Sequence, residues 1–222
     1  MSQPRPVVVL GDDGINRCAW SAGDEEYRRY HDEEWGVELR GDRPLFEKLS
    51  LEGFQAGLSW ITILRRRDTF RAAFHDFDID LVAALTEPDV ERLMLDGGII
   101  RNRAKIVATI ANAGIVRQLV QDDPGAFDRL LWGFAPPRGS RSRPVNFGDI
   151  PAVTAESTAL STELRAIGLR FVGPTTLYAL MQSSGMVDDH VEGCWRAGLR
   201  LSPSPESRTA APGPPSPTPA SM

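Results

Sequence analysis

Both cysteines of the chain are accompanied by a histidine at a spacing that suits a metal site. The pattern is Cys18-x12-His31 near the start and His190-x3-Cys194 near the end. One helical turn would place His190 and Cys194 on the same face. Two thiolates and two neutral imidazoles form a closed tetrahedral set that suits Zn²⁺ better than Mg²⁺ or Ca²⁺. These residues predict a structural zinc clip that joins the two ends of the domain.

The same residues have a simpler interpretation. Cys18 and Cys194 could be small buried hydrophobic residues or form a disulfide, while the two histidines are merely satisfied surface groups. A cytoplasmic location, which the sequence favours, disfavours the disulfide.

A second candidate site is an acid in an aromatic neighbourhood. Glu52 interrupts the apolar helical pattern of residues 51–60, where an unpaired carboxylate is costly. A carboxylate among rings suits a flat, cationic heterocycle, because ring faces stack on it and the acid supplies charge and hydrogen bonds. The aromatic residues on either side are Trp20, Tyr27, Tyr30, Trp35 and Trp60. Alternatively, the rings belong to the core, and Glu52 is partly exposed or caps a neighbouring turn.

Residues 164–177 predict a helix, a tight hairpin and a second helix. Gly173, followed by Pro174 and Thr175, starts the second helix with free backbone N–H groups. Such a helix start binds a DNA phosphate without much positive charge. The formal net charge of −5 mildly disfavours a protein that binds the phosphate backbone. A helix start of this kind could still bind DNA, because its contact depends on backbone N–H groups and not on basic side chains. The alternative is a plain corner between two helices.

Two further features could contact DNA. Residues 55–58 predict a turn with a protruding apolar tip at Leu58, next to Gly57. Residues 65–67 and the cations Arg101, Arg103 and Lys105 could add backbone contacts, or could simply form solvated faces.

Helices are expected to position all of these groups. Apolar periodicity predicts a helix that starts near Pro44, and others in 61–74, 79–85, 87–94, 106–120, 127–134, 154–167 and 175–183, with a basic loop at 138–144. No segment shows a persuasive alternation of apolar and polar residues, which would indicate a β-strand, so the predicted fold is all-α. We expect a flexible leader at 1–14, a helical domain at 15–201 and a disordered, Pro/Ser-rich tail at 202–222.

The sequence favours a cytoplasmic protein. No run approaches the ~18 apolar residues of a membrane helix, so we expect no membrane partner. The first residues lack the apolar region and cleavage site of a signal peptide.

Several of these motifs together resemble one family. They are the stretches 17–20, 30–37, 51–60, 98–106, 171–175 and 189–194, which include Arg17-Cys18-Ala19-Trp20 and Asp189-His190-Val191-Glu192-Gly193-Cys194. In this order they are similar to bacterial 3-methyladenine DNA glycosylase I, of the helix-hairpin-helix glycosylase superfamily. The resemblance covers residues 17–195 and implies a helical glycosylase fold whose termini are joined by zinc.

The resemblance also implies roles for individual residues. It assigns Zn²⁺ to Cys18, His31, His190 and Cys194, and the catalytic acid to Glu52. The residues that match the base pocket are Trp20, Tyr27, Tyr30 and Trp60, and those that match the DNA-binding positions are Gly57, Leu58, Gly173 and Thr175. The chain departs from the pattern in its two terminal extensions and at Asp188, where an asparagine is expected.

The implied activity is that of a monofunctional DNA glycosylase. It would hydrolyse the N-glycosidic bond of N3-methylated adenine in double-stranded DNA, leave an abasic site, and release free 3-methyladenine. The hairpin helix contains no lysine, which disfavours Schiff-base lyase chemistry. We expect a monomer that acts at the nucleoid. The competing hypotheses are a non-catalytic DNA-binding module and a binder of free methylated purines.

Overall fold

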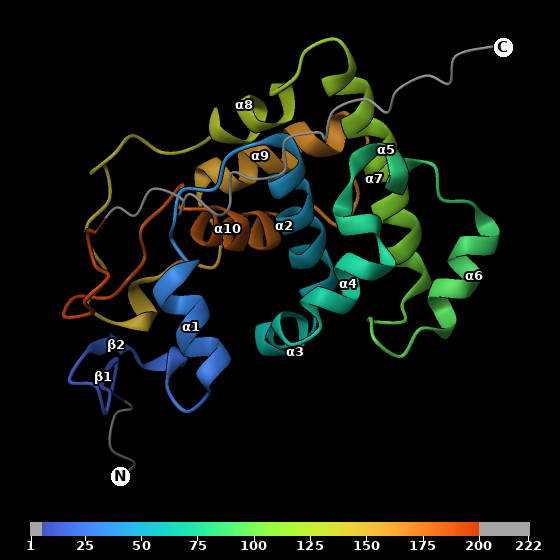
Figure 1. The fold of residues 1–222 in the computed structure, drawn as a ribbon. Helices are drawn as coiled ribbons and strands as arrows, with labels where there is room; N and C mark the ends of the chain where they lie inside the picture. Colours follow the sequence, from blue (N-terminus) through green and yellow to red (C-terminus); the bar gives the residue numbers. More distant parts are fainter. Residues whose placement is uncertain (1–5, 200–222) are drawn as a thin grey trace, which may run out of the picture.

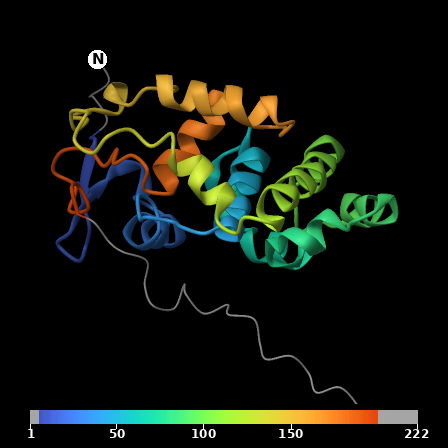
Figure 2. The same ribbon diagram turned by 90° about the horizontal axis from the view of Figure 1, so that it is seen from above.

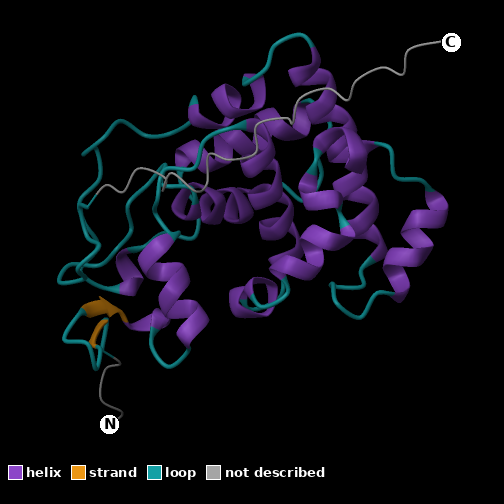
Figure 3. Cartoon of the chain, viewed as in Figure 1, coloured by secondary structure: helices purple, strands orange, loops and turns teal. Residues whose placement is uncertain are grey.

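The computed structural model describes residues 6–199, and these are mainly helical (Figures 1 and 3). The α-helices are α1 Glu25–Glu33, α2 Asp42–Gln55, α3 Trp60–Leu64, α4 Arg67–Ala73, α5 Ile79–Ala83, α6 Glu87–Leu95, α7 Arg103–Gln121, α8 Ala126–Trp132, α9 Ala155–Ala166 and α10 Pro174–Ser183. Short 3-10 helices occupy Ala19–Ser21, His75–Phe77 and Phe147–Asp149. Two strands, β1 Val8–Leu10 and β2 Asn16–Cys18, complete the described elements. The all-α prediction is thus confirmed in its main feature, although α1 was not predicted.

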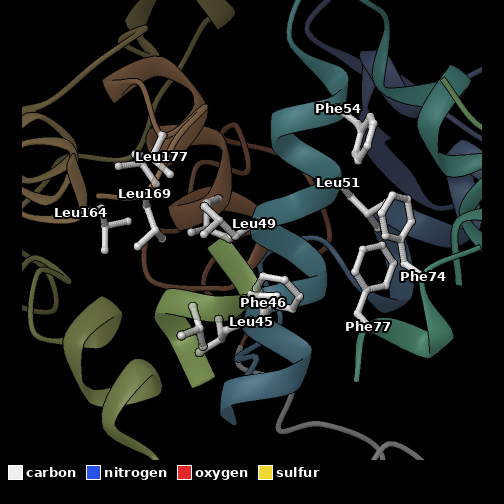
Figure 4. Close-up of a cluster of buried hydrophobic side chains, with 14 of the residues drawn as sticks. Leu45, Phe46, Leu49, Leu51, Phe54, Phe74, Phe77, Leu164, Leu169 and Leu177 are labelled. Atoms are coloured by element: carbon white, nitrogen blue, oxygen red, sulfur yellow. The ribbon is translucent and has the colours of Figure 1, made fainter. Parts of the chain in front are cut away.

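Helix α2 forms the centre of the hydrophobic core. Leu164, Leu169 and Leu177, from α9, the hairpin and α10, lie on one side of it, and Phe74 and Phe77 lie on the other (Figure 4). All five side chains are buried. Because α2 is covered on both sides, a polar side chain on either of these faces is removed from water. Such burial is costly unless the group finds a partner.

Local capping determines where several helices begin. Asp24, Asp78 and Asn102 each accept a hydrogen bond from a backbone N–H in the first turn of the following helix. Thr154 does the same for α9. These side chains satisfy N–H groups that have no partner within the helix. At α10, Gly173 precedes Pro174, which occupies the first turn where a missing N–H costs nothing.

The N-terminal segment differs from its prediction. Residues 8–10 were expected in a flexible leader, but they pair antiparallel with residues 16–18 in a small hairpin. A three-residue strand is too short to show alternation, and the turn at Gly11–Gly14 closes it. In both views the hairpin lies beside the C-terminal part of the described chain (Figures 1 and 2). The predicted tail at 202–222 lies outside the described residues.

Among residues 6–199, none of the helices combines the length and apolarity required to cross a bilayer.

Candidate active site and metal clip

The Glu52 side chain lies inside the protein, near the C-terminal end of α2. It is only 4 % exposed, which rules out the alternative of a partly exposed helix residue. Its Oε1 atom accepts a hydrogen bond from Ser183 Oγ, at the end of α10, over 3.0 Å. Burial raises the pKa of Glu52 to about 7, while Lys48 and Ser183 act in the opposite direction. The acid therefore changes charge near neutral pH, as groups in functional sites often do.

The predicted aromatic residues do form a connected set. The Tyr30 and Trp60 rings are 5.5 Å apart between centroids. Trp20 contacts Tyr27 edge-on at 5.6 Å and lies 6.5 Å from Tyr30. The Tyr27 hydroxyl accepts a hydrogen bond from the backbone of Ile61 over 3.1 Å, which fixes it to the start of α3 beside Trp60. The four base-binding candidates are thus brought together.

A group of charged residues beside these rings was missed by the sequence analysis. The Lys48 ammonium lies over the rings of Tyr30 and Trp60. Burial opposes the ionised form of Glu34, but Arg67 at 2.5 Å, together with Lys48, lowers the pKa of Glu34 to about 2. Lys48 could have been found, since it lies four residues before Glu52 and therefore shares its helix face. Ser183 carries no comparable signal.

The tip that follows α2 has the predicted form. A turn is closed by a hydrogen bond of 2.7 Å, which the Leu58 N–H donates to the Gln55 carbonyl. Gly57 has a φ of +85°, a conformation that favours glycine. Leu58 is 39 % exposed, so an apolar side chain projects from the surface within two residues of Trp60.

The hairpin between α9 and α10 is anchored to the core. Asn112 on α7 accepts a hydrogen bond from Arg170 N and donates one to Arg170 O, at 2.9 and 3.0 Å. Gly173 and Thr175 lie at the start of α10, where Thr175 is exposed. The same helix ends at Ser183, which bonds Glu52. One helix about 15 Å long therefore connects the candidate phosphate site to the buried acid.

Most of the arginines and lysines considered for DNA contacts are engaged within the protein. Arg65 pairs with Asp24, Arg67 with Glu34, and Arg103 with Glu87 and Glu91. Arg66 donates to the Gly97 carbonyl. Lys105 is buried, and its ammonium donates to the carbonyls of Phe54 and Ala56 at 2.9 and 2.7 Å. Lys105 thus caps the C-terminal end of α2, where carbonyl groups lack helical partners.

Three of the four predicted metal ligands meet in one place. Cys18, His31 and Cys194 are buried, and their donor atoms all lie within 4.8 Å of one another. Both cysteines are free. Cys194 Sγ is 3.4 Å from His31 Nε2, close to the spacing of about 3.5 Å that ligand atoms have around tetrahedral zinc.

His190 lies next to this cluster but not within it. Its ring centroid is 5.1 Å from that of His31, and its Nε2 atom is buried without a hydrogen-bond partner. The helical turn predicted for residues 190–194 is wrong, because this segment lies outside any helix and has a turn at 192–193. The reason is local: Gly193 adopts a φ of +86°, which a helix cannot accommodate.

The donor set fits a zinc ion. His31 Nδ1 and His190 Nδ1 bond the carboxylates of Asp32 and Asp188, at 2.8 and 2.9 Å, so each ring can present a deprotonated Nε2. This carboxylate–histidine arrangement is typical of zinc ligands. Asp188, the departure from the family pattern, therefore orients His190. Gly36 makes room for that ring, since a Cβ there would lie 2.8 Å from His190 Cε1.

Comparison with known proteins agrees with this geometry. The family model described as methyladenine glycosylase matches residues 20–197. The chain belongs to the methyladenine glycosylase family. It is 46 % identical over 180 residues to DNA-3-methyladenine glycosylase 1 of Escherichia coli K12, covering 81 % of this chain and 96 % of the relative. It is 41 % identical over 179 residues to DNA-3-methyladenine glycosylase of Haemophilus influenzae, covering 80 % and 96 %.

A solved structure shows the same fold. It is that of 3-methyladenine DNA glycosylase I from Staphylococcus aureus, described for its recognition of 3-methyladenine. The TM-score is 0.77 at 32 % identity, over 83 % of this chain and 98 % of the other. The family match spans Glu52, His31, His190 and Cys194 in this methyladenine glycosylase family member, and it begins after Cys18.

The raised pKa of Glu52 predicts a pH-dependent stability in this family member. The folded protein holds this proton more tightly than the unfolded chain, so stability falls as pH rises from the ordinary value of 4.5 to about 7. The full loss above that range is about 3 kcal/mol. Glu52→Gln cannot ionise at this position. We therefore expect its free energy of unfolding, measured in urea, to rise relative to that of the wild type when the pH is raised from about 5 to about 8.

The matched control is Glu163→Gln, an exposed glutamate on α9. Its stability difference from the wild type should be the same at both pH values. A constant difference for Glu52→Gln as well would contradict a buried, readily protonated acid at position 52.

Proposed function

We infer that this protein is a DNA-3-methyladenine glycosylase, which releases 3-methyladenine from alkylated DNA in base excision repair. The observation that carries this inference is the buried Glu52 carboxyl group near Tyr30, whose ring packs against Trp60, in a chain that matches nearly the full length of the E. coli enzyme. A non-catalytic DNA-binding module would have no use for a buried acid there, because burying it is costly.

The chemistry follows from the charge of the lesion. Methylation at N3 makes adenine cationic and weakens its glycosidic bond, so the leaving group needs little further activation. Trp60, with Tyr27 and Tyr30, supplies ring faces for stacking, and Trp20 supports Tyr27. Glu52 bonds the methylated purine and stabilises its positive charge in a site of low dielectric constant. Water then captures the sugar, which leaves an abasic site.

Access to the base requires that the nucleotide leave the duplex. We assign Leu58 to fill the vacated space, with Gly57 giving the turn its shape. Gly173 and Thr175, at the start of α10, are assigned to a DNA phosphate in a helix-hairpin-helix contact. Since α10 ends at Ser183, this contact would hold the backbone at a fixed distance from Glu52.

A structural Zn²⁺ belongs to the same proposal. Cys18, His31, His190 and Cys194 would hold it, with the unpartnered Nε2 of His190 as fourth donor. Its role would be to join the N-terminal hairpin to the C-terminal segment. The clip adjoins the base site through Trp20, whose ring lies 5.3 Å from that of His31.

The direct test is to incubate the protein with DNA treated with a methylating agent and to identify the free bases by chromatography. We expect 3-methyladenine in the soluble fraction, abasic sites in the DNA, and no covalent adduct on borohydride treatment. Absence of 3-methyladenine would refute the proposed function. A trapped adduct would refute the monofunctional mechanism only.

Replacing Leu58 by alanine tests the tip. We expect about 10-fold slower base release from duplex DNA. Removing the nucleotide from the base stack is costly, and alanine fills the vacated space less well than leucine does. Activity on single-stranded methylated DNA should change little, as should the thermal stability of the protein. Leu95→Ala is the matched control, since Leu95 is 83 % exposed at the end of α6. Equal losses on both substrates would contradict a gap-filling role.

The cytoplasmic location, the activity at the nucleoid and the monomeric state remain predictions from the sequence.

A further inference from the structure

Lys48 is placed to act on the acid of the proposed active site. It lies one turn before Glu52 on the same face of α2. Its ammonium nitrogen is 5.1 Å from the ring centroid of Tyr30 and 5.5 Å from that of Trp60. No acidic oxygen in the described part of the chain lies within ion-pairing distance of 4.0 Å. The ammonium is therefore held by ring faces rather than by a direct ion pair.

The other charges around Lys48 are already balanced. Glu34, which follows α1, pairs with Arg67 of α4 at 2.5 Å and with Arg29 at 2.7 Å. Glu47, on α2 itself, pairs with Arg71 at 2.8 Å. Burial lowers the pKa of Lys48, whereas Glu34 and Glu52 favour its charged form, and Glu52 is the one of these two acids that has no ion pair in the described part of the chain.

Glu52 has few other sources of stabilisation. Its hydrogen bond from Ser183 comes from a neutral hydroxyl. Burial raises the pKa of Glu52, and Lys48 is the cation that lowers it again, ahead of Ser183. Without Lys48, the pKa of the buried Glu52 carboxyl group would be higher still.

We propose that Lys48 is a positioning residue for Glu52: its ammonium, held over Tyr30 and Trp60, supplies the positive charge that keeps the buried acid in its carboxylate form until a cationic base arrives. This role rests on the proposed glycosylase function. Because Lys48 is not in direct contact with Glu52, the carboxylate stays available to the base. The arriving cation then takes over as counter-charge, and the rings that held the ammonium can stack on the base.

The test compares Lys48→Met, which keeps the length but loses the charge, with Lys48→Arg, which keeps the charge. The first readout is the titration of the Glu52 carboxyl carbon by NMR, with ¹³C-labelled glutamate and Glu52→Gln to assign the signal. We expect Lys48→Met to raise the titration midpoint by about one pH unit or more, and Lys48→Arg to stay near the wild type. Arg117→Met, an exposed cation on α7, is the control.

The second readout is the pH profile of kcat/KM for 3-methyladenine release. The acidic limb should move to higher pH in Lys48→Met by the same amount, with activity recovering at alkaline pH. A merely structural role would lower stability without moving either midpoint, and an unmoved carboxyl titration would overturn the proposal. If Lys48→Met does not fold, the same two measurements on Lys48→Gln test the proposal. The NMR titration needs no DNA, so its outcome is independent of whether the proposed function holds.

Discussion

Glu52→Gln is expected to lower kcat/KM for 3-methyladenine release by about 10² to 10³-fold, the loss typical when one preorganised electrostatic contact is removed. The amide has nearly the shape of the carboxyl group and can still accept from Ser183. It cannot oppose the positive charge of the base. The measurement is steady-state kinetics on duplexes with a single lesion, together with urea unfolding at the same pH.

The combination of results is diagnostic for Glu52. Activity should fall while stability at pH 8 rises, since removing a buried charge relieves its desolvation cost. Glu163→Gln should leave both quantities unchanged. Wild-type kinetics in Glu52→Gln would remove the acid from the mechanism. Parallel losses of activity and stability would indicate a structural role instead.

Purified protein is expected to contain about one equivalent of zinc, and Cys194→Ser to lose most of it. Loss of the ion would leave Cys18 and two buried histidines without their common partner, and would release the terminal segments from each other. We expect Cys194→Ser to be destabilised by about 3 kcal/mol or more, which corresponds to a fall in Tm of roughly 10 °C. Elemental analysis and thermal unfolding measure the two effects.

His75 provides the control for the zinc prediction. It is exposed and has a φ of +52°, a conformation that asparagine tolerates. His75→Asn should therefore keep both the zinc and the Tm. Less than about half an equivalent of zinc in the wild type would count against the clip, as would an unchanged Tm in Cys194→Ser.

Local sequence signals predicted much of this molecule. Apolar periodicity located α2, α7, α9 and α10 to within a few residues, because each buries a continuous stripe. The Gly-Pro start of α10 and the turn at Gly57 depend on backbone chemistry that the residues carry themselves. The prediction failed where elements were short: β1 was assigned to a leader, and residues 190–194 to a helical turn.

The helical class, the apolar tip and the residue types able to bind a cationic purine or zinc could be read from the amino-acid order, since these depend on side chains and spacings within one segment. Which charges act together follows from how the helices pack. Ser183 reaches Glu52 from 131 residues away, and Lys105 turned inward to cap α2 instead of facing DNA. Such contacts arise when α2, α7 and α10 pack, and the pKa of Glu52 depends on that burial more than on any neighbour in the chain.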